Sequence, residues 1–311
     1  MIGHVVRRVV AIIPVLLGVS IVVFAILRMV PGDPVVNFYG VEGATPEEMA
    51  GLRAKLGLDQ PVPIQYLAFL ERALQGDLGT SIMSNRPVSA DLMHYAMNTF
   101  QLAVVAMFFA LVVGGGLGLA AAAHPYSLLD NLALLVSLLG ISLPIYWVGL
   151  ILIWVFAVWL GLFPSFGKDT PMSYVLPAVT LSMPSIAVIA RLVRASVLEI
   201  RTHDFVRTAR GKGASDTRIL LRHIVPNALL PVITVMGLQL GYMLAGAVLT
   251  ETIFSWPGLG RYIVDAINAR DYPVVQAGVL FIGAVFVVLN LLTDLIITFL
   301  DPRLHATGVG L

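Results

Sequence analysis

The stretch DFVRTARGKGASDTRILLRHIVPNALLP, residues 204–231, is strongly basic and lies between two apolar parts of the chain. Asp204 can cap a helix that runs to about Gly211. Gly213 suits the left-handed position that ends a helix, and Ser215 can cap a second one. The positive-inside rule accounts for the arginines but not for two capped helices around a glycine. We therefore expect this segment to contact a partner in water.

The remainder of the chain has the composition of a membrane protein. Of its 311 residues, 58% are hydrophobic and 12% are charged, whereas soluble domains carry about 25% charged residues. So much apolar surface does not fit inside one aqueous core, so we interpret the chain as an integral membrane protein. It has no cysteine, which excludes disulfides, thiolate metal sites and thiol catalysis. A DNA-binding helix-turn-helix resembles residues 204–231 in outline, but a segment held to a bilayer at both ends does not suit nucleic acid.

Six apolar stretches predict transmembrane helices of about 20 residues each. They are residues 9–27, 102–123, 132–160, 175–190, 228–250 and 274–293. The first is too long for a signal-peptide core and is read as a retained span. The third can tilt or kink but not cross twice, and the fourth is short and is expected to continue through Arg191 and Arg194. Four prolines are expected to break helices within the membrane: Pro144, Pro177, Pro184 and Pro231.

The distribution of Lys and Arg predicts the orientation. With the N-terminus inside, the inner segments hold Arg7, Arg8, Arg191, Arg194, Arg201, Arg207, Arg210, Lys212, Arg218, Arg222 and Arg303. The longer outer segments hold Arg53, Lys55, Arg72, Arg86, Lys168, Arg261 and Arg270, and Arg28 marks the outer end of the first span. This bias places both termini and residues 204–231 in the cytoplasm. In the outer region, residues 31–97, a helix should start at Thr45 and end by Gly57, and another should cover 64–74.

A few polar residues fall at membrane depth, where such groups often face a water-filled path. The candidates for a translocation path are Asn98, Gln101, Gln239, Glu251, Asn290 and Asp294. For the residues other than Glu251 the alternative is inter-helix hydrogen bonding, which we favour for each singly unless Asp294 lies deep. For Glu251 the alternative is an interfacial turn without substrate contact, and both interpretations stay open. We expect Trp256 to lie in an interfacial aromatic belt. The glycines at 114–116 and 118 are expected to allow close helix packing.

Several motifs of catalytic proteins do not occur in the sequence. It contains no Gly-rich phosphate loop ending in Gly-Lys-Ser/Thr, no His-Glu-x-x-His and no nucleophile elbow. We therefore expect the chain not to be an enzyme, to bind no cofactor itself and to hold no metal.

The basic segment carries a family resemblance. TARGKGAS at 208–215, followed by NALLP at 227–231, resembles the "EAA" loop of ABC importer permeases. Arg-Thr-Ala at 207–209 replaces the usual Glu-Ala-Ala, a departure typical of the peptide/nickel branch. Further motifs similar to that branch cover nearly the whole chain: VPGDP at 30–34, YL at 66–67, GDLGTS at 76–81, ETIFSWPGLGR at 251–261, DYPVVQ at 271–276 and DPR at 301–303.

The resemblance implies an all-α integral membrane protein with six transmembrane helices, the type I ABC importer permease fold and a cytoplasmic coupling helix. It divides the chain into an N-terminal helix with an extracytoplasmic region (1–97), a five-helix transmembrane domain (98–301) with a coupling loop at 202–227, and a cytoplasmic tail (302–311). The residues implied to contact the ATPase are Arg207, Thr208, Ala209, Arg210, Lys212, Gly213, Ala214 and Ser215.

The resemblance also implies partners and a function. The partners are a second, similar permease, two ATPase subunits that bind ATP and Mg²⁺, an extracytoplasmic substrate-binding protein and the lipid of a bacterial or archaeal cytoplasmic membrane. The implied substrates are short peptides, with nickel, a nickel chelate or glutathione as alternatives within the family. An autonomous secondary transporter or channel is the alternative from another class, but no inverted repeat and no coupling set of acids is visible in the spans.

Overall fold

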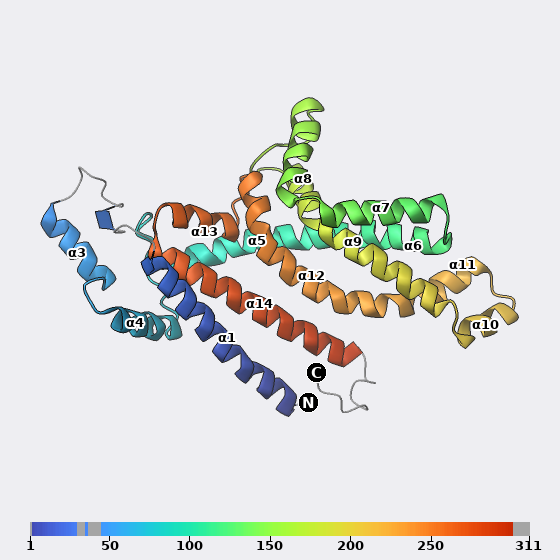
Figure 1. Cartoon of the computed structure of the whole chain (residues 1–311), viewed down its shortest axis with the longest axis horizontal. Coiled ribbons are helices and arrows are strands. Elements are labelled where there is room, and N and C mark those ends of the chain that lie inside the picture. Colours follow the sequence, from blue (N-terminus) through green and yellow to red (C-terminus); the bar gives the residue numbers. More distant parts are fainter. Residues whose placement is uncertain (1, 30–34, 37–44, 301–311) are drawn as a thin grey trace. The chain divides into compact units, whose positions relative to one another are not determined.

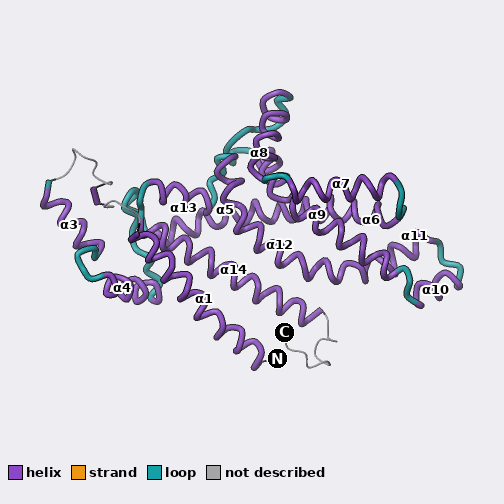
Figure 2. The backbone as a smooth tube through the Cα atoms, in the orientation of Figure 1, coloured by secondary structure: helices purple, strands orange, loops and turns teal. Residues whose placement is uncertain are grey.

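The structure is a computed structural model that describes residues 2–29, 35–36 and 45–300, and the side chains of residues 2–9, 11, 52, 55, 56 and 294–300 lie outside that description. The motifs at 30–34 and 301–303, the tail 302–311 and the Asp294 side chain therefore lie outside the described residues. Within them the regular structure is helical, apart from one isolated bridge between Thr80 and Pro87 (Figure 2).

The helices follow one another along the chain as Figure 1 shows. They are α1 (Ile2–Met29), α3 (Pro46–Leu56), α4 (Val62–Leu74), α5 (Val88–Phe109), α6 (Gly115–Ala123), α7 (Leu128–Ser142), α8 (Ile145–Leu152), α9 (Val175–Ile200), α10 (Asp204–Gly211), α11 (Asp216–Ile219), α12 (Val225–Ile253), α13 (Leu259–Asn268) and α14 (Tyr272–Leu300). Short π-helical turns are η1 (Ala110–Gly114), η2 (Ile153–Trp159) and η4 (Leu220–Ile224), and η3 (Pro171–Tyr174) is a 3-10 turn.

The chain divides into two compact units. Unit 1 comprises Met1–Thr99 and Pro257–Val288, and unit 2 comprises Phe100–Trp256 and Leu289–Leu311. Each unit therefore combines segments that are distant in the sequence.

Unit 1 is built around apolar side chains from α1, α5, α13 and α14, among them Leu27, Leu92 and Ile263. Two of the sequence motifs meet here. The Asp271 carboxylate accepts hydrogen bonds from the Ser81 hydroxyl at 2.6 Å and from the Ile82 backbone N–H at 3.2 Å. The GDLGTS loop is thereby attached to the start of α14.

Between α1 and α5, α3 begins and ends where its capping residues predict, whereas α4 begins at Val62, two residues before the predicted start. Thr45 and Glu48 form a reciprocal capping box at the start of α3, and Gly57 ends it with a φ of 66°. The N–H and hydroxyl of Thr45 both donate to the Glu48 carboxylate, which lowers its pKa.

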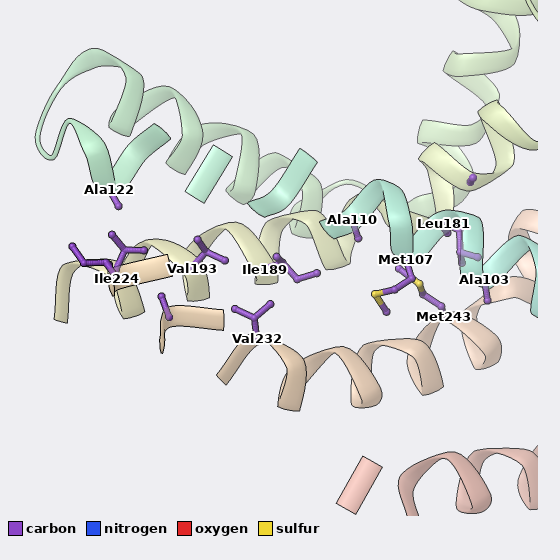
Figure 3. Close-up of a cluster of buried hydrophobic side chains, with 14 of the residues drawn as sticks. Ala103, Met107, Ala110, Ala122, Leu181, Ile189, Val193, Ile224, Val232 and Met243 are labelled. Carbon is purple, nitrogen blue, oxygen red and sulfur yellow. The ribbon is translucent and has the colours of Figure 1, made fainter. Parts of the chain in front are cut away.

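Unit 2 is centred on α9, which packs against α6, α7, α8 and α12. Figure 3 shows the core of this unit, where Ile189 and Val193 of α9 lie near Val232 of α12. Farther along the same core, Met243 of α12 lies near Met107 and Leu181. Ile189 and Val232 have no exposed surface. One helix with apolar residues on several faces is thus the centre of the unit, as expected for a buried helix.

Of the glycines at 114–116 and 118, Gly114 and Gly118 allow η1 and α6 to pack closely against α9. A Cβ on Gly114 would lie 2.8 Å from the Ile186 carbonyl oxygen, and one on Gly118 would lie 2.5 Å from that of Ala190. Gly115 and Gly116 have open space at the same point. The expectation of close packing is therefore confirmed for Gly114 and Gly118.

The described residues include five helices long and apolar enough to cross a membrane, and a sixth span if one bent pair is counted as one. The five are Ile12–Met29, Val88–Ala123, Pro171–Ile200, Asp216–Ile253 and Tyr272–Thr293. The bent pair is Leu128–Ser142 with Ile145–Trp159, and its two parts meet at 107° (Figure 1). This is the third predicted stretch, which breaks at Pro144.

The other three prolines do not break helices, so that prediction is wrong for Pro177, Pro184 and Pro231. Pro177 lies in the first turn of α9, where a missing N–H leaves no intrahelical bond unmade. Pro184 and Pro231 lie inside continuous helices. Membrane helices tolerate proline because neighbouring helices and local backbone adjustments satisfy the backbone groups that proline leaves without a hydrogen bond. The fourth span continues through Arg191 and Arg194 to Ile200, as expected.

Candidate functional site

The segment at residues 202–227 has an apolar inner face. Val206 of α10 and Ile219 of α11 are buried in the core of unit 2, and the half-buried Ala209 and Ala214 pack against it. Burying a Val or Ile side chain contributes about 1.5–3 kcal/mol. The segment is therefore an ordered part of unit 2.

The outer face of the same segment is exposed and basic. Arg207 and Arg210 keep 75% and 64% of their side-chain surface exposed, although each lies near an aspartate, Asp204 at 3.7 Å and Asp216 at 3.2 Å. Such exposed ion pairs contribute about 0–1 kcal/mol to the stability of the fold. The two arginines can therefore exchange these aspartates for acidic groups of a partner at little cost. The exposed basic residues are Arg207, Arg210, Lys212, Arg218 and Arg222, against the exposed acids Asp204 and Asp216.

The turn between the two short helices has the expected geometry. Gly213 has a φ of 81°, and its N–H donates to the Arg210 carbonyl at 2.9 Å. The Ser215 hydroxyl accepts from the Arg218 N–H and caps α11. At the start of α10 the prediction is wrong, because His203 is the capping position and Asp204 is the first helical residue. An acid there still faces the positive end of the helix dipole.

The segment leads directly into a long helix. α11, the π turn η4 and α12 form one continuous helical stretch, Asp216–Ile253, which contains an apolar window long enough to cross a membrane. π turns within α-helices are frequent at functional positions. A force applied to the basic face therefore has an uninterrupted helical route along unit 2.

A second polar cluster surrounds one of the path candidates, Gln101. Its side-chain oxygen accepts hydrogen bonds from Lys168 Nζ at 2.6 Å and from the Tyr174 hydroxyl at 3.0 Å. Lys168 Nζ also lies 5.9 Å and 5.7 Å from the ring centroids of Tyr174 and Trp256, within range of cation–π attraction. Lys168 and Tyr174 line a cavity of about 500 Å³.

The Trp256 ring faces neither lipid nor water, so the expectation that it lies in an interfacial aromatic belt is wrong. Its side chain is completely buried and meets Tyr174 edge to face at 4.5 Å between ring centroids. Its backbone N–H donates to the Glu251 carbonyl at 2.8 Å, so the turn after α12 folds the indole inward. Glu251 is also completely buried.

The remaining path candidates have separate surroundings. Gln239 of α12 donates to the Ser185 hydroxyl of α9 at 2.9 Å, which is the inter-helix hydrogen bonding given as the alternative. Asn98 donates to the Pro257 carbonyl at 2.7 Å within unit 1. Asn290 is half-buried, and the Asp294 side chain is outside the described residues. A path role for these residues stays a prediction.

Sequence reasoning missed Lys168, Tyr174 and an ion pair between Asp130 and Arg194. Arg194 Nε and Nη2 donate to the two carboxylate oxygens of Asp130, the latter at 2.7 Å. Asp130 keeps 6% of its side-chain surface exposed. A basic residue placed between two predicted spans was the available signal for Lys168. In the part of the chain that is described, no group of three or more His, Cys, Asp or Glu side chains is placed to hold a metal ion.

Two family profiles match this sequence. The family described as "binding-protein-dependent transport system inner membrane component" matches residues 114–306. The N-terminal family of the same membrane components matches residues 1–107. Together they cover nearly the whole chain.

The chain is similar over nearly its whole length to three permease proteins. It is 40% identical to the dipeptide transport system permease protein DppB of Escherichia coli (strain K12) and 39% identical to that of Alkalihalophilus pseudofirmus. It is 39% identical to the glutathione transport system permease protein GsiC of Salmonella typhimurium. In all three cases the match covers 98% of this chain and 99% of the relative.

Solved structures support the fold. A chain of the MetNI methionine ABC transporter in an inward-facing conformation matches with a TM-score of 0.56 at 21% identity, covering 68% of this chain and 96% of that chain. A chain of an amino acid ABC transporter matches with a TM-score of 0.52 at 18% identity, over 69% and 94%. The arrangement of helices is thus that of ABC importer membrane subunits.

Proposed function

This chain belongs to the family of inner membrane components of binding-protein-dependent transport systems, and we propose that it is a permease subunit of an ATP-driven importer of short peptides. It is a multi-pass membrane protein that works with ATPase and substrate-binding subunits. We assign ATP and Mg²⁺ to the ATPase subunits and no cofactor to this chain.

The observation that carries the proposal is the two-faced segment at residues 202–227. Its inner face, with Val206 and Ile219, is fixed in unit 2, while its outer face presents exposed cations. Such a surface suits an acidic groove on a partner in water. ATP-driven closure of the ATPases would push on this face, and α12 would carry the movement along unit 2.

The assembly is proposed to contain a second, similar permease, two ATPase subunits and one extracytoplasmic binding protein. We propose that both termini and the 202–227 segment lie in the cytoplasm, because the positive-inside rule favours the orientation in which the segments with more concentrated Lys and Arg face that side. Arg28 and the loop carrying Lys168 then lie toward the outer side.

The proposed substrate class is short peptides with free carboxyl ends. Support comes from the relatives, two of which are named for dipeptide and one for glutathione transport. Glutathione is a small peptide with the same kinds of polar groups, so it is the second candidate. Nickel or a nickel chelate is the third candidate, since the binding protein would select the substrate.

Uptake into proteoliposomes tests the function. The chain is reconstituted with its partner permease, ATPases and binding protein, and entry of a labelled dipeptide and of labelled glutathione is followed with and without ATP. ATP-dependent uptake of the dipeptide is expected. Uptake by the single chain under an ion gradient without ATP would instead identify a secondary transporter.

A further inference from the structure

Unit 1 contains a cavity of about 480 Å³. Three helices line it, namely the end of α1, α4 and the start of α14, together with the two loops that follow α3 and α4. This volume lies within the range of small-molecule sites, roughly 300–1,000 Å³. Its lining combines apolar side chains such as Phe24 and Phe69 with polar ones, among them Arg28, Gln65 and Gln276. The 202–227 segment contributes no residue to it.

Arg28 is fixed in this cavity by neutral groups. Its Nε and Nη2 donate to the Gln65 side-chain oxygen at 3.0 Å and 2.6 Å, and its Nη1 donates to the Phe24 carbonyl at 3.3 Å. The guanidinium carbon lies 3.3 Å from the centroid of the Phe24 ring. Gln65 is itself held, since its amide nitrogen donates to the Gln60 carbonyl at 2.8 Å. The guanidinium is thereby held in place before any ligand arrives.

The charge of Arg28 has no carboxylate partner among the described residues. Asp77 lines the same cavity but accepts from the Gly79 N–H at 2.9 Å. Asp271 nearby is occupied by the Ser81 hydroxyl and by backbone N–H groups. A half-buried guanidinium without a counter-charge is costly, and a carboxylate that pairs with it in good geometry offsets that cost.

The guanidinium also has unused donors. It carries five N–H groups, and the three hydrogen bonds to Gln65 and Phe24 engage three of them. The other two find no acceptor in the described part of the chain. Paired N–H groups of arginine match the two oxygens of a carboxylate.

We propose that this cavity is a carboxylate-binding site centred on Arg28, with Gln65 as its positioning residue. The carboxylate comes either from the C-terminus of a free short peptide or from a side chain of the binding protein. That the cavity opens on the outer side rests on the proposed function. The binding chemistry rests only on the geometry around Arg28.

The first arm of the test uses the full chain in lipid nanodiscs with glycylglycine and glycylglycinamide as probes. Glycylglycine is expected to bind about tenfold or more tightly than glycylglycinamide, because the hydrogen bonds of Arg28 to a charged carboxylate are stronger than those to a neutral amide. Arg28→Gln should remove this preference. Gln65→Glu should remove it too, since it places a carboxylate against Arg28 while keeping the size of the side chain.

Arg86→Gln is the control. Arg86 belongs to unit 1 and pairs with Asp91 at 3.1 Å, but it does not line the cavity. This variant should keep the preference for glycylglycine. Thermal unfolding of each variant identifies any that fail to fold, and Arg28→Lys, which keeps the charge and loses the paired donors, provides a second measurement with an expected weaker preference.

The second arm measures the affinity of the binding protein for the assembled transporter. If only this affinity falls with Arg28→Gln and Gln65→Glu, the carboxylate belongs to the binding protein. If only the glycylglycine preference falls, it belongs to the peptide. If neither changes in folded variants, the proposal is overturned. ATP-dependent uptake by the wild-type assembly is recorded in parallel, so a failed transport function is distinguished from a failed site.

Discussion

The backbone N–H of Ala214 donates a hydrogen bond of 3.2 Å to the carbonyl of Ala209. This bond closes the chain around Gly213, whose φ of 81° lies in the left-handed region. It joins the end of α10 to the residue before the cap of α11. The exposed basic face and the start of the helical route into α12 are therefore linked by one turn.

Replacing Gly213 by alanine should weaken coupling. A side chain in the left-handed region costs about 1–2 kcal/mol, so the turn would relax and shift α10 relative to α11. We expect less peptide transported per ATP hydrolysed by the reconstituted assembly. Gly211→Ala is the matched control, because Gly211 is the last residue of α10, has no positive φ and has open space at its Cβ position. Equal coupling in both variants would refute a role for the turn.

Reversing the charge of Arg210 should impair assembly rather than folding. Its pair with Asp216 is 64% and 88% exposed, and pairs of that kind contribute about 0–1 kcal/mol. For Arg210→Glu we therefore expect nearly unchanged thermal unfolding of the isolated chain but weaker binding to the ATPases, measured by co-purification over a series of salt concentrations. Unchanged binding would show that this face does not meet an acidic partner.

Gly118→Ala should destabilise unit 2. The added Cβ would lie 2.5 Å from the Ala190 carbonyl oxygen and 2.8 Å from the Val193 Cβ, and overpacking of this kind costs about 1–3 kcal/mol. Gly116→Ala, where nothing lies within 4 Å of the new atom, should leave thermal unfolding in detergent unchanged. A similar melting temperature for the two variants would contradict the packing of α6 on α9.

The ion pair between Arg194 and Asp130 should behave as a coupled unit. Arg194→Gln removes the guanidinium that pairs with the Asp130 carboxylate. The Asp130 side chain is only 6% exposed, so its charge would be left buried without a partner. We expect lower thermal stability for Arg194→Gln and for Asp130→Asn, and a smaller loss in the double variant than the sum of the two. Additive losses would mean that the pair does not link α7 to α9.

Much of the fold could be predicted because hydropathy and capping act locally. The five long spans and the helices that begin after Thr45 and Ser215 follow from apolar length and from side chains that satisfy free N–H groups. Proline was a weaker guide. Only Pro144 interrupts its span, since Pro184 and Pro231 are accommodated by packed neighbours.

The polar sites could be predicted only in part. Exposure and charge on α10 follow from its sequence, because the apolar Val206 is buried while its charged neighbour Arg207, about 100° further round the helix, is exposed. The burial of Trp256 and the meeting of Lys168 with Gln101 depend on how distant segments pack. No local pattern records such contacts.

Cross-linking at a single introduced cysteine tests most directly whether the exposed face of residues 202–227 contacts the ATPase. The chain has no cysteine of its own, so Lys212→Cys provides one unique thiol next to the Gly213 turn, and Leu74→Cys provides an exposed control in α4. The assembled transporter is treated with a short thiol-to-amine cross-linker and the products are separated by mass. We predict an adduct with the ATPase for Lys212→Cys and none for Leu74→Cys. No ATPase adduct at Lys212→Cys in an assembled, transporting complex would contradict the account.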